Sequence, residues 1–445
     1  MSENLRTVAD ATCTFCGCVC DDMVLTVDMD EKRITKAKNA CVLGRAWFAK
    51  HAIGDHPAAL IDGKEVSVED AIEEAAQILA KARFPIIYGL SDVICEAQRQ
   101  AVAIADLVRG NIDTTTSVCH GPSGIAFQDV GESTATLGEV KNRADLVIYW
   151  GGNPAESHPR HFTRYAVTPK GMFIPRGKKD RTVVLVDVRK TPSTPVADIF
   201  LQVKPGKDFE LAWALRALVR GVELDSSIED ETGVSLAVLQ DLATRMKTCR
   251  YGVLFFGMGL TMTRGRHFNS GAVLALTTDL NEFTHFVTKP VRGHGNVTGA
   301  DNVLSWQTGF PFGVNFSMGY PRFGPGEFTT VDVLAKGDAD AALIIASDPG
   351  SNFPRGAIEH LRSIPVICLD TKPTATSKLA KVAFATSTYG INTAGTVYRM
   401  DDVPITLRAA FESPYPDDLQ ILTSIRKRVA ELVGEKRVPA LKQAS

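Results

Sequence analysis

The sequence predicts a multidomain α/β protein with buried parallel strands, on three observations. Its 445 residues exceed the size of one ordinary domain. Short apolar runs rich in β-branched residues recur along the chain, and each ends abruptly in Gly, Asp, Asn or Pro. Longer stretches that suit helices separate these runs, as in SVEDAIEEAAQILAKA (67–82). Runs that are apolar on both faces and alternate with helices are typical of parallel sheets covered on both sides.

Six such runs are expected to be strands. In chain order they are PIIYGLSD (85–92), DLVIYWGGNP (145–154), TVVLVDVRKT (182–191), YGVLFFGMGLT (251–261), AALIIASDPG (341–350) and PVICLDTKPT (365–374). In parallel sheets, ligands bind beyond the carboxyl ends of the strands, which is where these Gly, Asp and Asn residues stand. A cofactor-binding α/β protein is therefore the expectation.

Two of these units resemble each other. ADLVIYWGGNPAESHPR with VVLVDVRKTPSTPVADIFLQV is echoed by ADAALIIASDPGSNFPR with PVICLDTKPTATSKLAKVAFAT. In each half the first strand ends in a small polar turn with Pro, and the second ends in Asp before a loop rich in Thr, Ser and Pro. The echo suggests two similar ligands or one pseudo-symmetric ligand. The alternative is that two α/β units share generic strand-end chemistry.

Composition narrows the class of protein. The formal net charge of −2 leaves no basic excess, so we expect no nucleic-acid partner. The longest apolar runs are far shorter than the roughly 20 residues that a bilayer-spanning helix needs, so we expect no membrane partner. The N-terminus lacks the apolar segment of a signal peptide. Nine cysteines, an odd count, fit a reducing cytoplasm, where clustered thiols more often mean metal or catalysis than disulfides.

Four cysteines crowd into CTFCGCVC (13–20), and another follows in NACVLGR (39–45). The spacing Cys13-x2-Cys16-x3-Cys20 with a distant Cys41 lacks the second paired knuckle that zinc ribbons prefer. Three close thiolates and one distant thiolate suit the four irons of a [4Fe–4S] cluster, which we favour. Zinc and, less so, a disulfide remain alternatives. Cys18 is left over, as a bystander or an alternative ligand.

A further cysteine lies in the small-residue loop TTTSVCHGPSG (114–124). Cys119 stands directly before His120 there, which suits a nucleophile, a metal ligand or a buried small residue. We assign no role to Cys95, Cys249 and Cys368.

Seven motifs along the chain carry a family resemblance. They are CTFCGCVCDD, SVCHGPS, GEVKNRADLVIYWGGNP, HPRH, GVLFFGMG, RGHGNVTG and ASDPG. From about residue 10 to residue 410 the chain thereby resembles the B subunit of formylmethanofuran dehydrogenase, within the molybdopterin oxidoreductases. The resemblance implies the molybdopterin-oxidoreductase fold without its C-terminal β-barrel domain. It implies a small iron–sulfur domain (1–60), a central portion with the metal-site loops (61–145 and 290–330) and two related dinucleotide-binding domains (146–289 and 331–445).

The same resemblance implies the cofactors and their residues. It implies one [4Fe–4S] cluster on Cys13, Cys16, Cys20 and Cys41, two molybdopterin guanine dinucleotides, and tungsten or molybdenum bound by Cys119. His120 and Arg292 would flank the open face of the metal, with Arg292 stabilising carboxylate charge and His120 moving a proton. The remaining cofactor-binding residues implied are Arg45, Gly151, Asn153, Asp187, Arg189, Asp348 and Asp370.

The implied activity is reversible reduction of CO2 to formate in a cytoplasmic complex. Implied partners are an amidohydrolase-like A subunit that attaches formate to methanofuran, polyferredoxin-type electron carriers and a small molybdopterin-dinucleotide-binding subunit. Two alternatives are a cofactor-free scaffold subunit of a formyltransferase/hydrolase complex and a formate dehydrogenase-like enzyme. The loop YGINTAGTVYRMD (389–401) lacks the acidic residues expected before its Gly-Thr, which leaves the role of the loop around Asn392 open.

Overall fold

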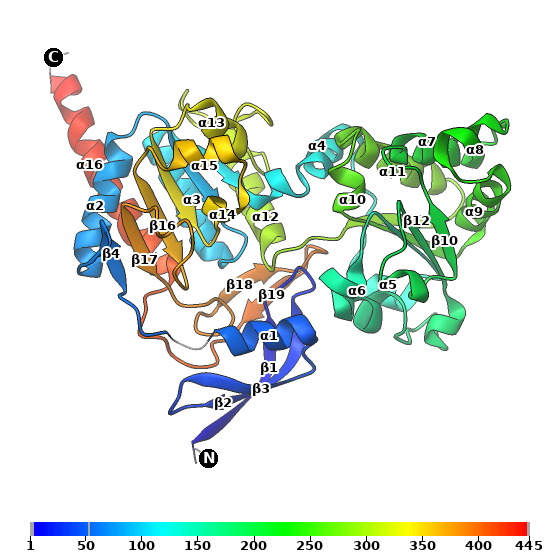
Figure 1. Cartoon of the computed structure of the whole chain (residues 1–445), viewed down its shortest axis with the longest axis horizontal. Coiled ribbons are helices and arrows are strands. Elements are labelled where there is room, and N and C mark those ends of the chain that lie inside the picture. Colours follow the sequence, from blue (N-terminus) through cyan, green and yellow to red (C-terminus); the bar gives the residue numbers. More distant parts are fainter. Residues whose placement is uncertain (1–3, 52–53, 443–445) are drawn as a thin grey trace. The chain divides into compact units, whose positions relative to one another are not determined.

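The computed structural model describes residues 4–51 and 54–442, with side chains as far as residue 434, and divides the chain into two compact units. The first unit comprises Met1–Val118, His294–Arg399 and Pro404–Ser445. The second comprises Cys119–Gly293 with Met400–Val403. In Figure 1 the first unit therefore contains the blue start of the chain together with its orange and red end.

The first unit begins with a small antiparallel sheet. Its strands follow the order β1 (Leu5–Cys13), β2 (Cys20–Asp28) and β3 (Arg33–Lys38). Every second residue of β2 is buried at Met23, Leu25 and Val27, as a strand with one inward face requires. The helix α1 (Val42–Lys50) follows and packs against β3. This small sheet carries the first cysteines of the chain.

A nine-stranded sheet forms the body of the first unit. Its order is β14 (Arg322–Phe323), β13 (Val314–Asn315), β7 (Asn111–Thr114), β6 (Pro85–Gly89), β15 (Ala341–Ile345), β16 (Val366–Asp370), β17 (Val382–Ala385), β4 (Ala59–Ile61) and β5 (Lys64–Glu65). The five strands from β7 to β17 are parallel, and β13 and β4 flank them in antiparallel pairing. The strands β18 (Gly395–Tyr398) and β19 (Pro404–Leu407) form a separate hairpin.

Alternate residues of the parallel strands face two helix layers. Ile87, Leu343 and Ile367 pack with α2 (Val68–Lys81), α3 (Cys95–Val108), α12 (Val297–Thr308) and α16 (Asp418–Lys442). Ile86 and Ile344 pack with α13 (Thr330–Lys336) and α15 (Arg355–Leu361) on the opposite face. Burial on both faces is the reason why these strands read as continuous apolar runs in the sequence.

The second unit is a five-stranded parallel sheet. Its order is β10 (Ile199–Gln202), β9 (Thr182–Asp187), β8 (Leu146–Trp150), β11 (Tyr251–Phe256) and β12 (His285–Pro290). One face packs on α7 (Asp208–Val219), α9 (Leu236–Thr248) and α11 (His267–Leu280). The remaining helices are α4 (Gly121–Val130), α5 (Leu137–Arg143), α6 (Pro154–Ser157), α8 (Ser227–Thr232) and α10 (Met258–Thr261).

The α/β prediction is confirmed, but the expected domain boundaries group the chain differently from the structure. The portions expected at 61–145 and 331–445 are not separate bodies, because β6 pairs directly with β15 in one sheet. Residues 119–145 belong to the second unit instead. Local sequence patterns identify strands, whereas strand order depends on pairing between distant segments. Among the helices that the structure describes, none is long and apolar enough to cross a membrane.

Candidate functional site

The first cysteine cluster is built on a hairpin. Cys13 ends β1 and Cys20 begins β2, and the two residues are cross-strand partners. The connecting loop carries Cys16 and turns back at Val19, whose N–H donates to the main-chain oxygen of Cys16 at 3.0 Å. Cys41 joins from elsewhere as the N-cap of α1. The hairpin and the helix start thus bring Cys41 to the three cysteines that are already close together in the sequence.

A glycine lies against the sulfurs. The N–H of Gly44 donates to Sγ of Cys41 at 3.4 Å. A Cβ atom at Gly44 would lie 3.1 Å from Sγ of Cys13 and 3.8 Å from Sγ of Cys41. Burial raises the pKa of the Cys13 thiol well above its usual range, and the nearby thiols of Cys16, Cys20 and Cys41 raise it further. A methyl group at this position would therefore be in tight contact with Sγ of Cys13.

This donor set fits an iron–sulfur cluster. In the described part of the chain, no three His, Cys, Asp or Glu side chains are arranged around one metal ion. A [4Fe–4S] cluster does not need such a convergence, because it takes one thiolate on each iron. Cys18 is 1 % exposed, and hydrogen bonds with Cys16 and Cys20 raise the pKa of its thiol. Arg45 lies on α1, where its guanidinium donates to the main-chain oxygen of Ala40 at 3.3 Å.

A tyrosine that the sequence patterns did not single out anchors this loop. The hydroxyl of Tyr389 donates to the main-chain oxygen of Thr14 at 2.8 Å, and the hydroxyl of Thr14 donates to the main-chain oxygen of Tyr389 at 3.2 Å. The Tyr389 ring lies 6.3 Å from the ring of Trp47 on α1. The loop around Asn392 therefore has a structural contact with the residue that follows Cys13. Thr14 and Tyr389 are 375 positions apart, so no local sequence signal predicts their contact.

The second unit holds Cys119, His120 and Arg292. His120 is the N-cap residue of α4 and is buried, with Nδ1 3.1 Å from the hydroxyl of Ser123. Burial, and to a smaller extent the guanidinium of Arg292, lower the pKa of His120 to about 3. No hydrogen-bond partner for its Nε2 occurs among the described residues. The main-chain oxygen of Cys119 accepts from the hydroxyl of Thr261 at 3.4 Å.

The glycines of WGGNP and FFGMG have a shared explanation. Gly151 has a φ of +58°, and a Cβ there would lie 2.3 Å from the main-chain nitrogen of Leu260. A Cβ at Gly259 would lie 2.7 Å from the main-chain oxygen of Gly151. The ends of β8 and β11 therefore pack backbone to backbone. This packing brings the loop after β8 beside α10, which follows β11.

The two strand-end loops that resemble each other in sequence also make the same pattern of hydrogen bonds, each within its own unit. In the second unit, the hydroxyl of Ser193 donates to Oδ1 of Asn153 at 2.6 Å and accepts from the N–H of Ala155 at 3.1 Å. In the first unit, the hydroxyl of Thr376 donates to Oδ1 of Asp348 at 2.7 Å and accepts from the N–H of Gly350 at 2.9 Å. The likeness therefore extends from sequence to contacts.

The second strand of each of the two similar units also ends in an aspartate. Asp187 and Asp370 end β9 and β16. Oδ1 of Asp187 accepts from the N–H of Arg189 at 3.3 Å. Burial raises the pKa of Asp370 to about 7, although the N–H of Thr371 opposes that shift. Hydrogen bonds from Thr376 and Ser351 outweigh partial burial and lower the pKa of Asp348.

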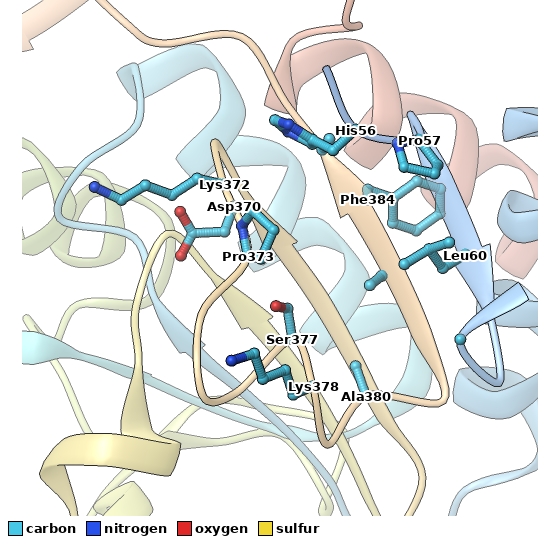
Figure 2. A pocket seen from close by; sticks show the side chains of 13 residues that line it. His56, Pro57, Leu60, Asp370, Lys372, Pro373, Ser377, Lys378, Ala380 and Phe384 are labelled. Carbon is cyan, nitrogen blue, oxygen red and sulfur yellow. The ribbon is translucent and has the colours of Figure 1, made fainter. Parts of the chain in front are cut away.

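Asp370 lines a cavity of about 350 Å³ in the first unit. Figure 2 shows Phe384, Pro57 and Leu60 together on one side of this cavity, with Asp370 and Lys372 on the other. A second cavity of about 160 Å³ shares three lining residues with it, namely His56, Lys372 and Pro373. The second cavity extends past Thr386 and Asn392 to Lys50 and His51 at the end of α1. An apolar wall with a single carboxylate suits a flat heterocycle with N–H groups.

The structure divides the predicted site residues between the units. The first unit holds Cys13, Cys16, Cys20, Cys41, Arg45, Asp348 and Asp370. The second holds Cys119, His120, Gly151, Asn153, Asp187, Arg189 and Arg292. The residues at or just after the carboxyl ends of parallel strands, where α/β proteins bind ligands, are Gly151, Asn153, Asp187, Arg189, Arg292, Asp348 and Asp370. The cluster cysteines lie instead on the antiparallel hairpin of β1 and β2 and at the start of α1.

Comparisons with known proteins identify the family. No protein-family model matches the chain. The chain is 44% identical over 439 residues to the B subunit of the tungsten-containing formylmethanofuran dehydrogenase 2 of Methanocaldococcus jannaschii, covering 96% of this chain and 100% of that protein.

Two solved structures share its fold. In the formyltransferase/hydrolase complex (FhcABCD) of Methylorubrum extorquens, a chain matches with a TM-score of 0.68 at 24% identity, over 84% of this chain and 99% of that one. Acetylene hydratase of Pelobacter acetylenicus matches with a TM-score of 0.69 at 14% identity, over 95% of this chain and 70% of that one. The chain therefore belongs to the B-subunit family of formylmethanofuran dehydrogenases, as its motifs predict.

Proposed function

We propose that this chain is the subunit that interconverts CO2 and formate in a formylmethanofuran dehydrogenase. The observation that carries the proposal is the presence, on one chain, of two groups: the cysteine hairpin with Cys41 beside it, and the half-buried Cys119 next to the buried His120, in the same unit as the buried Arg292. The related protein of M. jannaschii is named as tungsten-containing. A scaffold without redox chemistry would need neither the cysteine hairpin nor the loop cysteine.

Cofactor roles follow from the donor chemistry. Cys13, Cys16, Cys20 and Cys41 would hold a [4Fe–4S] cluster, with Gly44 leaving room beside the sulfurs. The thiolate of Cys119 would bind tungsten or molybdenum, since thiolates suit such soft metal sites. When bound, the pterin-held metal supplies two-electron chemistry and the cluster supplies single electrons. Arg45, one turn after Cys41, is proposed to lie between cluster and pterin.

His120 and Arg292 are proposed to act on the substrate. Arg292 would donate charge-assisted hydrogen bonds to the carboxylate of formate and to the negative charge that develops on CO2 oxygens. Burial holds the pKa of His120 at about 3, so its ring is neutral near pH 7. A neutral ring can accept a proton at the nitrogen that has none, and the unpartnered Nε2 is the atom available for contact with substrate.

Two pterin dinucleotides would occupy the two echoed loops. The cavity at Asp370 suits the guanine of one of them, because the carboxylate can accept from the base while Phe384 and Leu60 cover it. The second cavity would take the polar arm that leads toward α1. Buried Nε2 of His56 and Oγ1 of Thr386 line this path without a hydrogen-bond partner in the described chain, as expected of atoms that bind a ligand. Gly151, Asn153, Asp187 and Arg189 would serve the other dinucleotide.

The proposal includes partners. We infer an amidohydrolase-like A subunit that condenses formate with methanofuran, polyferredoxin-type electron carriers and a small pterin-dinucleotide-binding subunit, all in the cytoplasm. The scaffold alternative rests on the fold shared with a chain of the M. extorquens complex, and the greater identity to the M. jannaschii protein favours the redox role.

Formate oxidation by the anaerobically purified complex, followed with a low-potential viologen dye, tests this function. The Cys119→Ser variant should lose about a hundredfold or more in rate, because an alkoxide or hydroxyl replaces the soft ligand. The Cys249→Ser variant changes a partly buried thiol outside the site and should keep its rate. A wild-type complex that binds the metal yet oxidises no formate, or a fully active Cys119→Ser variant, would refute the proposal.

A further inference from the structure

The motif HPRH (158–161) has no part in the function proposed above, yet its first residue contacts the candidate active site. His158 is 2 % exposed, and its Nε2 lies 2.7 Å from the main-chain oxygen of Arg292. Its Nδ1 lies 2.8 Å from the hydroxyl oxygen of Ser157. Both ring nitrogens therefore have partners, and one partner is the main chain of the residue proposed to bind formate.

The chemistry of the partners assigns the protons on His158. A main-chain oxygen can only accept, so Nε2 carries a proton and donates it to Arg292. Burial lowers the pKa of His158 to about 4, so the ring is neutral and Nδ1 bears a lone pair. Nδ1 then accepts from the hydroxyl of Ser157. A neutral histidine with this tautomer matches the two partners at once.

His158 is also fixed at its main chain. Its N–H donates to the main-chain oxygen of Pro154 at 2.8 Å and so closes the single turn of α6. That turn starts directly after Asn153, in the loop proposed to hold a dinucleotide. The hydroxyl of Ser157 also lies 3.0 Å from the main-chain oxygen of Asn153, so its single proton is shared between that oxygen and Nδ1 of His158. A compact series of hydrogen bonds thus joins the loop after β8 to Arg292.

The residue that follows Arg292 has open space around its α-carbon. Gly293 follows directly, and a Cβ atom built there would meet nothing within 4 Å among the described residues. Before Arg292, the N–H of Val291 donates to the main-chain oxygen of Phe256 at 2.9 Å. The bond from His158 therefore holds the main chain between the contact of Val291 and the open position at Gly293.

We propose that His158 is a positioning residue, which holds the main chain of Arg292 and thereby aims its guanidinium at the carboxylate of formate. Through α6, the same histidine makes the position of Arg292 depend on the loop at Gly151 and Asn153. This inference deepens the proposed function and rests on it for the role of Arg292. The hydrogen bond and its mechanical effect can be tested without catalysis.

The test compares three variants of the intact complex. In His158→Phe the ring remains but the donor is lost, and in His158→Gln an amide N–H can still donate. His360→Phe is the matched control, because Nε2 of His360 lies 2.8 Å from the main-chain oxygen of Ala339 in the other unit. Formate KM and kcat, tungsten and molybdenum content, and hydrogen exchange of residues 291–296 by mass spectrometry are measured for each.

Loss of the bond should raise the KM for formate about tenfold in His158→Phe, with unchanged metal content and faster exchange in residues 291–296. His158→Gln should stay within about threefold of wild type, and His360→Phe should match it. If His158→Phe does not assemble, Ser157→Ala tests the same contact and should raise KM about threefold.

Three results would overturn the inference. One is a KM and an exchange rate in His158→Phe equal to wild type. A second is loss of metal in proportion to activity, which would assign His158 to the cofactor. The third is an equal KM rise in His158→Gln and His158→Phe. A wild-type complex without formate activity would refute the proposed function, whereas the exchange measurement would still decide whether His158 holds residues 291–296.

Discussion

Asn153 and Asp348 occupy equivalent positions at the ends of two different sheets. Each precedes a one-turn helix, with φ and ψ of −123° and 72° at Asn153 and −120° and 63° at Asp348. Each side-chain oxygen accepts from a hydroxyl on the loop after the next strand, Ser193 in one unit and Thr376 in the other. One strand in each of two sheets with different strand orders is thus followed by the same hydrogen-bonded turn, in which the side chain of the N-cap residue accepts from a hydroxyl of a neighbouring loop.

Because both turns have this hydrogen bond, we expect its loss to reduce dinucleotide binding equally in the two units. In Ser193→Ala and in Thr376→Val, the loop loses the hydroxyl that joins the cap residue to the helix, at a cost of about 1 kcal/mol. We expect each variant to retain about half of the guanine nucleotide that acid releases from wild type, since one loop is disturbed in each. Unchanged nucleotide content in both variants would show that these loops do not hold the cofactors.

The cysteine hairpin predicts which thiols carry the cluster. Cys13→Ala or Cys41→Ala should remove about four irons per chain, because each iron of a cube needs its own thiolate. Cys18→Ala should keep the iron, since Cys18 already hydrogen-bonds to Cys16 and Cys20. Iron analysis with electron paramagnetic resonance of the reduced complex measures this. Loss of the cluster in Cys18→Ala, with retention in Cys41→Ala, would exchange their roles.

Gly151 and Gly434 predict stability changes of opposite sign. Gly151→Ala combines a φ of +58° with a Cβ 2.3 Å from main chain, so it should cost more than about 2 kcal/mol of unfolding free energy. Gly434 lies within α16, where a Cβ would meet nothing within 4 Å of the described chain. Gly434→Ala should therefore gain up to about 1 kcal/mol. Melting temperatures of the two variants in the complex compare them directly, and equal shifts would contradict the packing described for β8 and β11.

Buried histidines predict a loss of stability in acid. Burial lowers the pKa of His161 from 6.5 to about 3, so the unfolded chain binds a proton between these values that the folded chain excludes. The stability contribution is complete above pH 6.5 and falls as pH drops, by up to about 1.4 kcal/mol per pH unit. His161→Phe leaves the hydroxyl of Tyr149 without this partner, so stability should be lower at pH 8 but should decline less steeply. Melting temperatures from pH 5 to pH 8 give the slope, and an unchanged slope would be evidence against a neutral His161.

The sequence predicted most of what depends on neighbouring residues. The strands, their polar ends and the cysteine spacing are local patterns, and α/β architecture follows from them. The echo at Asn153 and Asp348 was visible because each strand end needs a small polar residue before its turn. The family prediction is confirmed by the 44% identical relative. The roles assigned to individual site residues stay predictions.

Contacts between segments that are far apart in the chain could not be predicted from the sequence. The bond from His158 to Arg292 joins residues 134 positions apart, and only the folded second unit brings them together. The pair of hydrogen bonds between Thr14 and Tyr389 is a similar case, since neither residue type predicts which residue it will contact. The sequence does not predict the strand order for the same reason, because an apolar strand can pair with any other buried strand until the whole sheet is assembled.

The content of tungsten plus molybdenum in the anaerobically purified complex tests the central claim most directly. We predict close to one metal atom per copy of this chain in the intact wild-type complex. Which of the two metals is found would also identify the cofactor. An intact wild-type complex without either metal would contradict the redox role and leave the scaffold alternative.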